Sequence, residues 1–344
     1  MDPIEFRDRI QEIIQEALKE DLDIDIGRSN GSLSAAVADL SARIAEVAAR
    51  QAAQLEFDLL ASEDAAESAG NVTKVSPKNK LNDLTGAQWL WFTKSIFRTS
   101  YPSILGHDLR KRQGGNKPPQ LMQDLIEFFT KPDGLVLDPF AGAGGTALGA
   151  HLAGRSSVNV EINPESIAIY HKVCKREGIE PHKFIEGDCR EVLSTFPGDS
   201  FDFIATDPPY SPELEQTMSG AKANAPYGRQ NRKSSYITYS DDPRDLSKAE
   251  NFDAYFHEMT KIGEELLRVL KPEKYMAMIL RDAYQDGRYI PTSAIIAQNY
   301  NRIGWVFKGE KIWYATGTRI RPYGYPNAFV PNIIHQNILI FRKE

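Results

Sequence analysis

The sequence predicts an α/β protein in which helices cover both faces of a mostly parallel β-sheet. From about residue 83 onward, segments with a strand pattern alternate with segments with a helical pattern, which is the order that builds such a sheet. A glycine-rich turn follows the first buried strand, and acidic residues follow the next strands. These turns meet at one edge of a parallel sheet, where ligands bind.

The composition is that of an ordinary globular protein. Of the 344 residues, 41% are hydrophobic and 26% charged, which excludes disordered and collagen-like chains. No apolar run approaches the roughly 20 residues that cross a bilayer. The N-terminus lacks the basic-then-apolar layout of a signal peptide, so we expect a cytoplasmic protein. Two cysteines are too few for a disulfide framework or a four-thiolate metal site, and the six histidines show no metal-ligand spacing.

Charge divides the chain at residue 70. Residues 1–70 hold 16 acids and 6 bases, a balance of −10, so the rest of this chain of net charge −6 has a balance of +4. The larger part is mildly basic and can approach a polyanion, whereas the acidic segment would repel one.

Residues 1–70 are expected to form a helical arm. Apolar residues recur along it at alternating spacings of four and three, at Leu33, Val37, Leu40, Ile44 and Val47. This is the seam pattern of a coiled coil or helical hairpin. Homodimerisation through the arm and docking of the arm on its own domain both stay open. Polar residues 71–82 predict a linker, and residues 83–344 form the α/β domain.

Boundaries of the elements follow from apolar runs and capping residues. Apolar runs predict strands at 135–137, 157–161, 184–185, 201–205, 275–280, about 305–313 and 338–341. Helical patterns lie at 120–129, 146–154, 164–178, about 191–195, 252–270 and about 290–300. The third of these helices has the clearest ends, since Asn163 caps it, Pro164 takes its first position and Gly178 ends it.

The turn after the first strand predicts a nucleoside-type cofactor site. It reads Asp-Pro-Phe-Ala-Gly-Ala-Gly-Gly-Thr from Asp138 to Thr146. Its glycines let a ligand lie against the backbone, and the helix N-terminus offers unpaired N–H groups. Spacing alone does not exclude NAD, because Ala147 can serve as the third small residue. The Asp138 carboxylate, however, would repel a pyrophosphate and suits the cationic amino group of S-adenosylmethionine.

Two further acids end the following strands. Glu161 comes 23 residues after Asp138, where a carboxylate can accept hydrogen bonds from both ribose hydroxyls. Asp188 is placed to meet an adenine amino group. Each also fits a simpler role, Glu161 as a solvated strand end and Asp188 as a helix cap. Three acids at the ends of three successive strands favour the cofactor interpretation.

The sequence Asp-Pro-Pro-Tyr, Asp207 to Tyr210, follows the fourth strand and predicts a site for a flat amino group. Pro208 and Pro209 fix the chain, so the carbonyl before or between them points outward. A carboxylate and a carbonyl together can accept both hydrogens of an exocyclic amine, which favours the pyramidal nitrogen that attacks a methyl sulfonium. Tyr210 offers a face for stacking of an extruded base. A stiff turn capped by Asp207 is the alternative.

With these two motifs the chain resembles the S-adenosylmethionine-dependent amino-group DNA methyltransferases, which modify adenine N6 or cytosine N4. The resemblance runs from about residue 83 to the C-terminus and includes Asn116-Lys117-Pro118 and the segment 325–332. It implies a Rossmann-like fold with a mostly parallel seven-stranded sheet, S-adenosylmethionine as cofactor, S-adenosylhomocysteine as product and no metal. Cofactor contacts are expected from Asp138, Pro139, Phe140, Gly142, Gly144, Thr146, Glu161, Asp188 and Lys117, and catalysis from Asp207, Pro208, Pro209 and Tyr210.

DNA is the expected partner, and its recognition is expected in an inserted loop at about 211–250. Too few residues separate the two motifs for a recognition domain between them, and a loop of this length is unusual. Basic residues there, and in a second basic-aromatic cluster with Tyr323 and Tyr325, suit phosphates and guanine edges. These residues are Lys222, Arg229, Arg232, Lys233, Arg319 and Arg321. A solvated lid is the alternative for the loop.

The expected reaction is direct in-line methylation of adenine N6 in DNA. Cytosine-C5 methylation needs a thiolate after a proline, a context that neither Cys174 nor Cys189 has. An aspartate leading the second motif tilts the resemblance toward adenine, while cytosine N4 stays open. RNA guanine-N2 methyltransferases and glutamine methyltransferases of release factors also resemble this motif pair. A non-catalytic nucleic-acid-binding partner subunit is a further alternative, and a restriction or defence-system partner is open.

Overall fold

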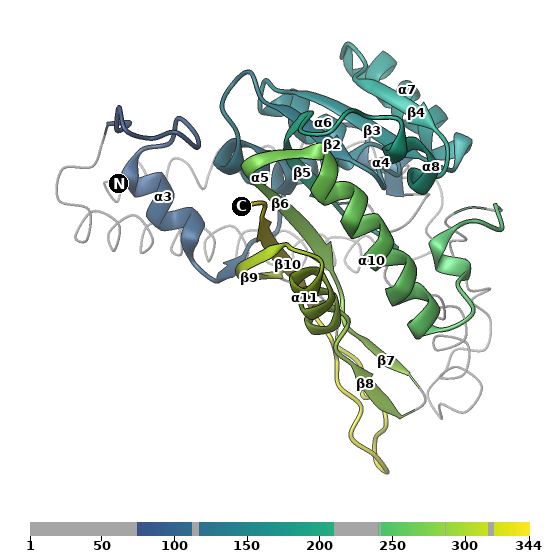
Figure 1. Cartoon of the computed structure of the whole chain (residues 1–344). Coiled ribbons are helices and arrows are strands. Elements are labelled where there is room, and N and C mark those ends of the chain that lie inside the picture. Colours follow the sequence, from purple (N-terminus) through teal and green to yellow (C-terminus); the bar gives the residue numbers. More distant parts are fainter. Residues whose placement is uncertain (1–73, 112–116, 210–239, 241, 286, 316–319) are drawn as a thin grey trace, which may run out of the picture. The chain divides into compact units, whose positions relative to one another are not determined.

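The computed structural model describes residues 74–111, 117–209, 240, 242–285, 287–315 and 320–344 (Figure 1). Contacts between Cα atoms divide the chain into two units, 1–72 and 73–344, and everything described here belongs to the second. The predicted arm 1–70 lies outside the described residues. So do Tyr210, Lys222, Arg229, Arg232, Lys233 and Arg319, with most of the expected recognition loop.

An eight-stranded sheet is the centre of this unit, in the order β1-β9-β10-β6-β5-β2-β3-β4. Its strands are β1 (Ile96–Arg98), β2 (Leu135–Asp138), β3 (Ser156–Glu161), β4 (Lys183–Glu186), β5 (Phe201–Thr206), β6 (Leu270–Leu280), β9 (Val306–Tyr314) and β10 (His335–Arg342). β10 is antiparallel to both neighbours, and the other pairs are parallel. A small antiparallel hairpin, β7 (Ala283–Gln285) and β8 (Arg288–Ile290), follows β6.

Helices flank this sheet on both faces, as the sequence predicts. They are α3 (Gly86–Thr93), α4 (His107–Arg110), α5 (Pro119–Phe129), α6 (Gly145–Leu152), α7 (Pro164–Glu177), α8 (Cys189–Ser194), α10 (Phe252–Val269) and α11 (Thr292–Arg302), with a short 3₁₀ helix η2 (Leu246–Lys248). Side chains of β6 alternate between two apolar clusters: Met276 and Met278 pack with α10 and α11, and Ala277 and Ile279 with α3 and α5. Alternation along a strand places these clusters on opposite faces.

The sheet has one strand more than the seven expected. β1 lies at its edge, parallel to β9, with Ile96 opposite Ile312. Three residues are too few for a period-2 pattern to distinguish a strand from a loop. β1 is defined by its pairing with β9, a strand some two hundred residues later in the chain. The local sequence does not indicate such a distant pairing.

The ends predicted for the 164–178 helix are confirmed in α7. The Asn163 side chain accepts a hydrogen bond from the Glu165 N–H at 2.9 Å, Pro164 is the first helical residue, and Gly178 adopts a left-handed conformation at the C-terminal end. This helix follows β3 directly, so its start fixes the short turn that carries Glu161 at the end of that strand.

Helices α5 and α6 approach each other closely at Gly149. A Cβ atom on Gly149 would lie 2.6 Å from the Met122 Cβ and 2.8 Å from the Pro119 carbonyl oxygen, so only glycine fits. The contact holds the start of α5, and Lys117 just before it, against the helix that follows the glycine-rich turn.

Part of the segment expected as a linker packs on the domain. Asn82 is fully buried, and its side-chain NH₂ donates to the Phe128 carbonyl oxygen while its Oδ1 accepts from the Trp89 indole at 2.9 Å. Polar composition suggested a free connection, but asparagine side chains here satisfy buried backbone and indole groups. Within the described residues, no helix is long and apolar enough to span a membrane.

Candidate active site

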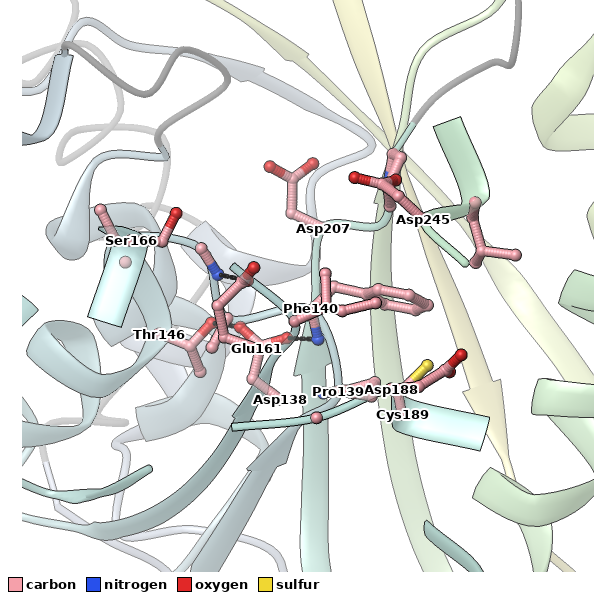
Figure 2. A pocket seen from close by; sticks show the side chains of 18 of the residues that line it. Asp138, Pro139, Phe140, Thr146, Glu161, Ser166, Asp188, Cys189, Asp207 and Asp245 are labelled. Atoms are coloured by element: carbon pink, nitrogen blue, oxygen red, sulfur yellow. Dashed lines mark hydrogen bonds between the residues drawn. The ribbon is translucent and has the colours of Figure 1, made fainter. Parts of the chain in front are cut away.

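One cavity opens at the carboxyl ends of β2, β3 and β5 and collects most of the residues singled out from the sequence (Figure 2). Those that line it are Lys117, Asp138, Pro139, Phe140, Gly142, Thr146, Glu161, Asp188, Asp207 and Pro209. Gly144 and Pro208 are their chain neighbours, outside the lining. The cavity includes about 930 Å³ of open space, counting the solvent at its mouth.

Asp138 connects three elements beneath the cavity. Its carboxylate accepts hydrogen bonds from the Phe140 N–H at 3.0 Å, the Thr206 hydroxyl at 2.8 Å and the Thr146 hydroxyl at 2.5 Å. The side chain is only 2% exposed, and this burial raises its pKa to about 6. Asp138 therefore holds the glycine-rich turn and the ends of β2 and β5 together. Its contact with the amino group of a cofactor stays a prediction.

The glycine-rich turn uses its glycines for two different reasons. Gly144 has φ +81°, and a Cβ there would lie 2.3 Å from the Tyr170 ring, so close packing excludes a side chain. Gly142 has φ +50°, and a Cβ there would meet nothing within 4 Å. The space above Gly142 is therefore open toward the cavity and can take a ligand laid against the backbone.

Glu161 reaches back from the end of β3 to this turn. Its Oε2 accepts a hydrogen bond from the Gly142 N–H at 2.6 Å, and its Oε1 accepts one from the Asn163 N–H at 2.7 Å. Burial raises the pKa of Glu161 to about 7, against the lowering effect of these two N–H donors. Each carboxylate oxygen has a second lone pair, so the group can still accept from a pair of ribose hydroxyls.

Asp188 is a helix cap, the simpler of the two roles that the sequence left open, and it also lines the cavity. It caps α8 by accepting from the Arg190 N–H at 2.9 Å, and its side chain pairs with the Arg190 guanidinium at 2.5 Å. Arg190 also contacts Glu258 on α10 at 3.0 Å. The guanidinium thus binds the end of β4 to α10. The contact of Asp188 with an adenine amino group stays a prediction.

The two catalytic-motif residues that line the cavity are held by contacts from distant segments. Lys117 Nζ donates to Asp207 Oδ2 at 2.6 Å, and their side chains are 4% and 17% exposed. The buried hydroxyl of Tyr255, on α10, donates to the Pro209 carbonyl oxygen at 2.7 Å. Tyr255 thereby fixes the chain after the second proline, and acceptance of an amine by the carbonyl before or between the prolines stays a prediction.

Arg110 connects the glycine-rich turn with Lys117. Its guanidinium donates to the Lys117 carbonyl oxygen at 2.7 Å and to the Ala143 carbonyl oxygen at 3.4 Å. The side chain is 1% exposed, and burial lowers its pKa to about 10, which leaves it charged at neutral pH. Lys117, one of the expected cofactor contacts, thus lines the cavity between Arg110 and Asp207, and its contact with a cofactor stays a prediction.

Sequence reasoning missed several lining residues. Ser166, Cys189, Arg244, Asp245 and Leu246 all border the cavity. Asp245 caps η2 by accepting a hydrogen bond from the Ser247 N–H at 2.8 Å. In the sequence alone, this segment cannot be told from any other polar turn. Its position near the end of the expected recognition loop is the one signal that could have suggested it, because that loop must return to the same edge of the sheet.

Of the six nucleic-acid contacts expected, only Arg321 is described. It is exposed and lies in the segment before β10, away from the cavity lining. Among the described residues there is no group of three or more His, Cys, Asp or Glu side chains that could hold a metal ion.

The residues present fit S-adenosylmethionine. Carboxylates from five segments, those of Asp138, Glu161, Asp188, Asp207 and Asp245, border the cavity around Phe140 (Figure 2). These five carboxylates outnumber the two cationic side chains of the lining, Lys117 and Arg244, which suits a cationic sulfonium and amino group and disfavours a pyrophosphate. The open space at Gly142 and the acceptor oxygens of Glu161 suit a nucleoside.

Fold and site together define a Rossmann-like S-adenosylmethionine-dependent methyltransferase. A family model described as DNA methylase, for enzymes of the N6 and N4 amino groups, matches residues 54–172 and 201–344, about three quarters of the chain. The protein belongs to this family of methyltransferases, whose cofactor is S-adenosylmethionine. A model described as RNA cap guanine-N2 methyltransferase also matches residues 133–213.

Individual relatives cover shorter stretches. The tRNA (guanine(10)-N2)-dimethyltransferase of Pyrococcus abyssi is 30% identical over 27% of this chain and 28% of its own. YubD of Escherichia coli, provisionally named a methylase, is 40% identical over 18% of this chain and 28% of its own. The chain thus matches just over a quarter of the length of each. A protein of Thermus thermophilus, provisionally named a DNA modification methylase and solved with S-adenosyl-L-methionine, is 22% identical over 46% of this chain and 51% of its own, with a TM-score of 0.29.

Proposed function

We propose that this protein transfers a methyl group from S-adenosylmethionine to the N6 amino group of adenine in DNA. One observation carries the proposal: the Asp207 carboxylate shares a cavity with Glu161 and the open face of Gly142. A ribose held at Glu161 and an amine held at Asp207 then lie in the same cavity, as a direct transfer requires.

Asp207 and Pro208 would orient the substrate amine, and Lys117 and Tyr255 hold these residues in place. S-adenosylmethionine supplies a methyl group on a sulfonium, which is electrophilic without any help from a metal. Asp207 and the carbonyl of Pro208 accept the two amine hydrogens, so that the nitrogen lone pair turns away from the base ring and toward the methyl. Lys117 fixes one oxygen of Asp207 at 2.6 Å and Tyr255 fixes the chain after Pro209 at 2.7 Å. The amine nitrogen forms its bond to carbon as the carbon–sulfur bond breaks, and its surplus proton leaves to solvent.

Family membership supports DNA as the substrate, and the aspartate that leads the second motif supports adenine over cytosine. Guanine N2 in RNA is a second candidate. The RNA cap guanine-N2 model matches residues 133–213, which include both motifs, and the tRNA methyltransferase is 30% identical over 27% of this chain. Guanine N2, cytosine N4 and adenine N6 are all flat exocyclic amines, so the same carboxylate and carbonyl serve each.

The test is incubation of the purified full chain with labelled S-adenosylmethionine and mixed-sequence duplex DNA or RNA, followed by nucleoside mass spectrometry. We expect N6-methyladenine in DNA. Asp207→Ala should abolish the product and keep cofactor binding. Asp202→Ala is the matched control, because Asp202 is also 17% exposed and also pairs with a lysine, Lys271 at 2.9 Å, outside the cavity. N4-methylcytosine or N2-methylguanine as the sole product would overturn the assignment of the base.

The domain boundaries belong to the same proposal. Residues 1–70 form a helical arm that joins two copies, and 71–82 lead to the catalytic domain. Residues 211–250 recognise the DNA sequence, and Arg319 and Arg321 are further contacts with the DNA. A chain lacking residues 1–70 should be a monomer by light scattering, whereas the full chain should be a dimer. An unchanged mass per particle, after allowance for the deleted residues, would contradict dimerisation through the arm.

A further inference from the structure

A projecting element of basic and aromatic residues leaves the sheet at the edge that carries the active-site cavity. It consists of the hairpin residues 281–285 and 287–290 and the segment 320–334, and is called the prong below. β6 runs parallel to β5, so the prong begins where β6 ends, at the same edge as Asp207 after β5. The segment 320–334 leads into β10, which is antiparallel to β6, and so meets the hairpin there. In Figure 1 both parts extend below β6, beyond the ends of α10 and α11.

The two parts of the prong are joined to each other. The Tyr284 hydroxyl donates to the Phe329 carbonyl oxygen at 3.4 Å, and the Arg281 guanidinium donates to the Ile333 carbonyl oxygen. Within the segment, the Asn332 side chain pairs with both backbone groups of Arg321 at 2.8 Å each. The segment is thereby closed into a loop whose base is fixed to the hairpin.

The tip of this loop is a tight turn that presents aromatic side chains to solvent. The Asn327 and Ala328 N–H groups both donate to the Gly324 carbonyl oxygen at 2.8 Å. Gly324 has φ +73°, and a Cβ there would lie 2.3 Å from the Ala328 carbonyl oxygen, so the turn requires glycine. Phe329 is 86% exposed and Tyr325 72%. Such a concentration of exposed apolar surface at the end of a held loop marks an interaction site.

The charge of the segment 320–334 favours a polyanion. Arg281, Arg288 and Arg321 are exposed; Asp282 and Asp286 balance the two hairpin arginines in the sequence, but no Asp or Glu occurs between residues 315 and 343. Asp282, an acid at the base of the hairpin, is occupied by the Tyr289 hydroxyl at 2.6 Å and the Ser293 N–H at 3.0 Å. Arginines around exposed aromatic rings are the pattern by which proteins hold phosphates and stack on bases.

We infer that the prong binds duplex DNA beside the target nucleotide, with Phe329 inserted into the base stack and Arg321 on the phosphate backbone. The inference rests on the proposed function for its place next to the reacting base. Extrusion of a base leaves a gap in the stack, and an apolar wedge in that gap replaces the lost stacking. Phe329 is the most exposed large apolar side chain among the described residues, and the turn at Gly324 holds it at the tip.

The test measures binding of the full chain to two labelled duplexes by fluorescence anisotropy, one intact and one with a single abasic site. The abasic duplex already has the gap that a wedge fills, so wild-type protein should bind it about tenfold more tightly. Phe329→Ala should bind both duplexes alike. Trp91→Ala, which removes another exposed aromatic side chain, on α3, is the matched control and should keep the preference.

Arg321→Ala tests the phosphate contact separately. It should weaken binding to both duplexes equally and lower the slope of log K against log salt by about 1, while the exposed Arg302→Ala on α11 leaves the slope unchanged. Wild-type protein without a preference for the abasic duplex, or a Phe329→Ala variant that keeps it, would overturn the inference. So would tighter binding to duplex RNA of the same sequence. DNA binding through the prong without any methylated product would overturn the proposed function alone.

Discussion

Asp207 and Lys117 form an ion pair that is largely removed from water. Their side chains are 17% and 4% exposed, and the Arg110 guanidinium holds the Lys117 backbone at 2.7 Å. The lysine therefore fixes the orientation of the Asp207 carboxylate toward the amine, which makes Lys117 a positioning residue for the proposed reaction.

Replacement of Lys117 by methionine should lower kcat about 100-fold, because a displacement of a reacting group by about 1 Å costs that much. KM for S-adenosylmethionine should change little, and Lys117→Arg should restore part of kcat. Steady-state kinetics with both substrates separates these values. The control is Lys271→Met, which breaks the Asp202 ion pair outside the cavity. A raised KM for the cofactor with unchanged kcat would show that Lys117 contacts the cofactor and does not position Asp207.

Glu161 should make cofactor binding depend on pH. Burial raises its pKa to about 7, so in the free protein the carboxyl holds its proton over a range in which an ordinary glutamic acid has lost it. The ionised form accepts from both ribose hydroxyls and attracts a cation, so affinity should rise as pH increases through 7 and binding should release a proton. Calorimetric titrations in buffers of different ionisation enthalpy measure this release. Glu161→Gln should bind more weakly, without proton release.

The sign for folding is opposite to that for binding. Asp138 and Glu161 both have folded-state pKa values above those of the unfolded chain, at about 6 and about 7. Their protonated forms therefore contribute stability that is fully present below about pH 4 and is lost as pH rises through 6 to 7. A cation in the cavity offsets that loss, since it stabilises the ionised forms.

Residue types and strand ends in the sequence predict the acids of the cavity, but not what each carboxylate contacts. Asp138 and Asp188 line the cavity as expected, while their hydrogen bonds go to Thr146, Thr206 and Arg190. Thr206 comes from a distant segment, and even for the nearby Thr146 and Arg190 one sequence does not show which hydroxyl or guanidinium group points to the carboxylate. Tyr255 was missed for the same reason, since it looks like one more core residue of a helix.

The contact of α5 with α6 depends on the absence of a side chain at Gly149. Gly149→Ala would bring a Cβ within 2.8 Å of the Pro119 backbone, so the helices must separate. We expect a loss of about 1–3 kcal/mol in the free energy of unfolding, as for overpacked cores. Gly198→Ala is the control, because its Cβ would come no closer than 3.5 Å to any neighbour and should change stability by less than about 0.5 kcal/mol. Denaturant melts that gave equal values would contradict the close approach.

Elements with long apolar patterns and clear caps were predicted well, as α7 and α10 show. The short elements β2, β4 and α8 were also predicted, but β1 and the β7-β8 hairpin, with only three residues per strand, were not. These strands are defined by pairing with their partner strands. Three residues are too short to show the alternating pattern of apolar and polar residues. The same limit applies to η2, whose cap Asp245 borders the cavity.

For the whole molecule, the cofactor should act as a stabilising ligand. A ligand that binds only the folded state adds about 2.7 kcal/mol at a concentration 100 times its Kd, which raises the Tm of a domain this size by several degrees. Thermal melts with and without S-adenosylmethionine measure the shift. Asp202→Ala should keep it and Glu161→Ala should lose most of it. An equal shift in both variants would place the cofactor away from Glu161.

The position of β10 has a consequence for how the protein is made. β10 follows β6 and β9 in the chain yet lies between them, and β1 pairs only with β9. The half of the sheet formed by β2, β3, β4 and β5 can therefore assemble on the ribosome as soon as residue 206 has emerged, with the glycine-rich turn already in place. β6 can then pair with β5 once residue 280 has emerged, but β9 and β1 must wait until β10 is complete at residue 342. Until then β6 has an open edge, and such pairings between distant segments are slow to form. The nascent chain thus passes through a stage in which the nucleoside site is built and the sheet beside it is still exposed to other strands.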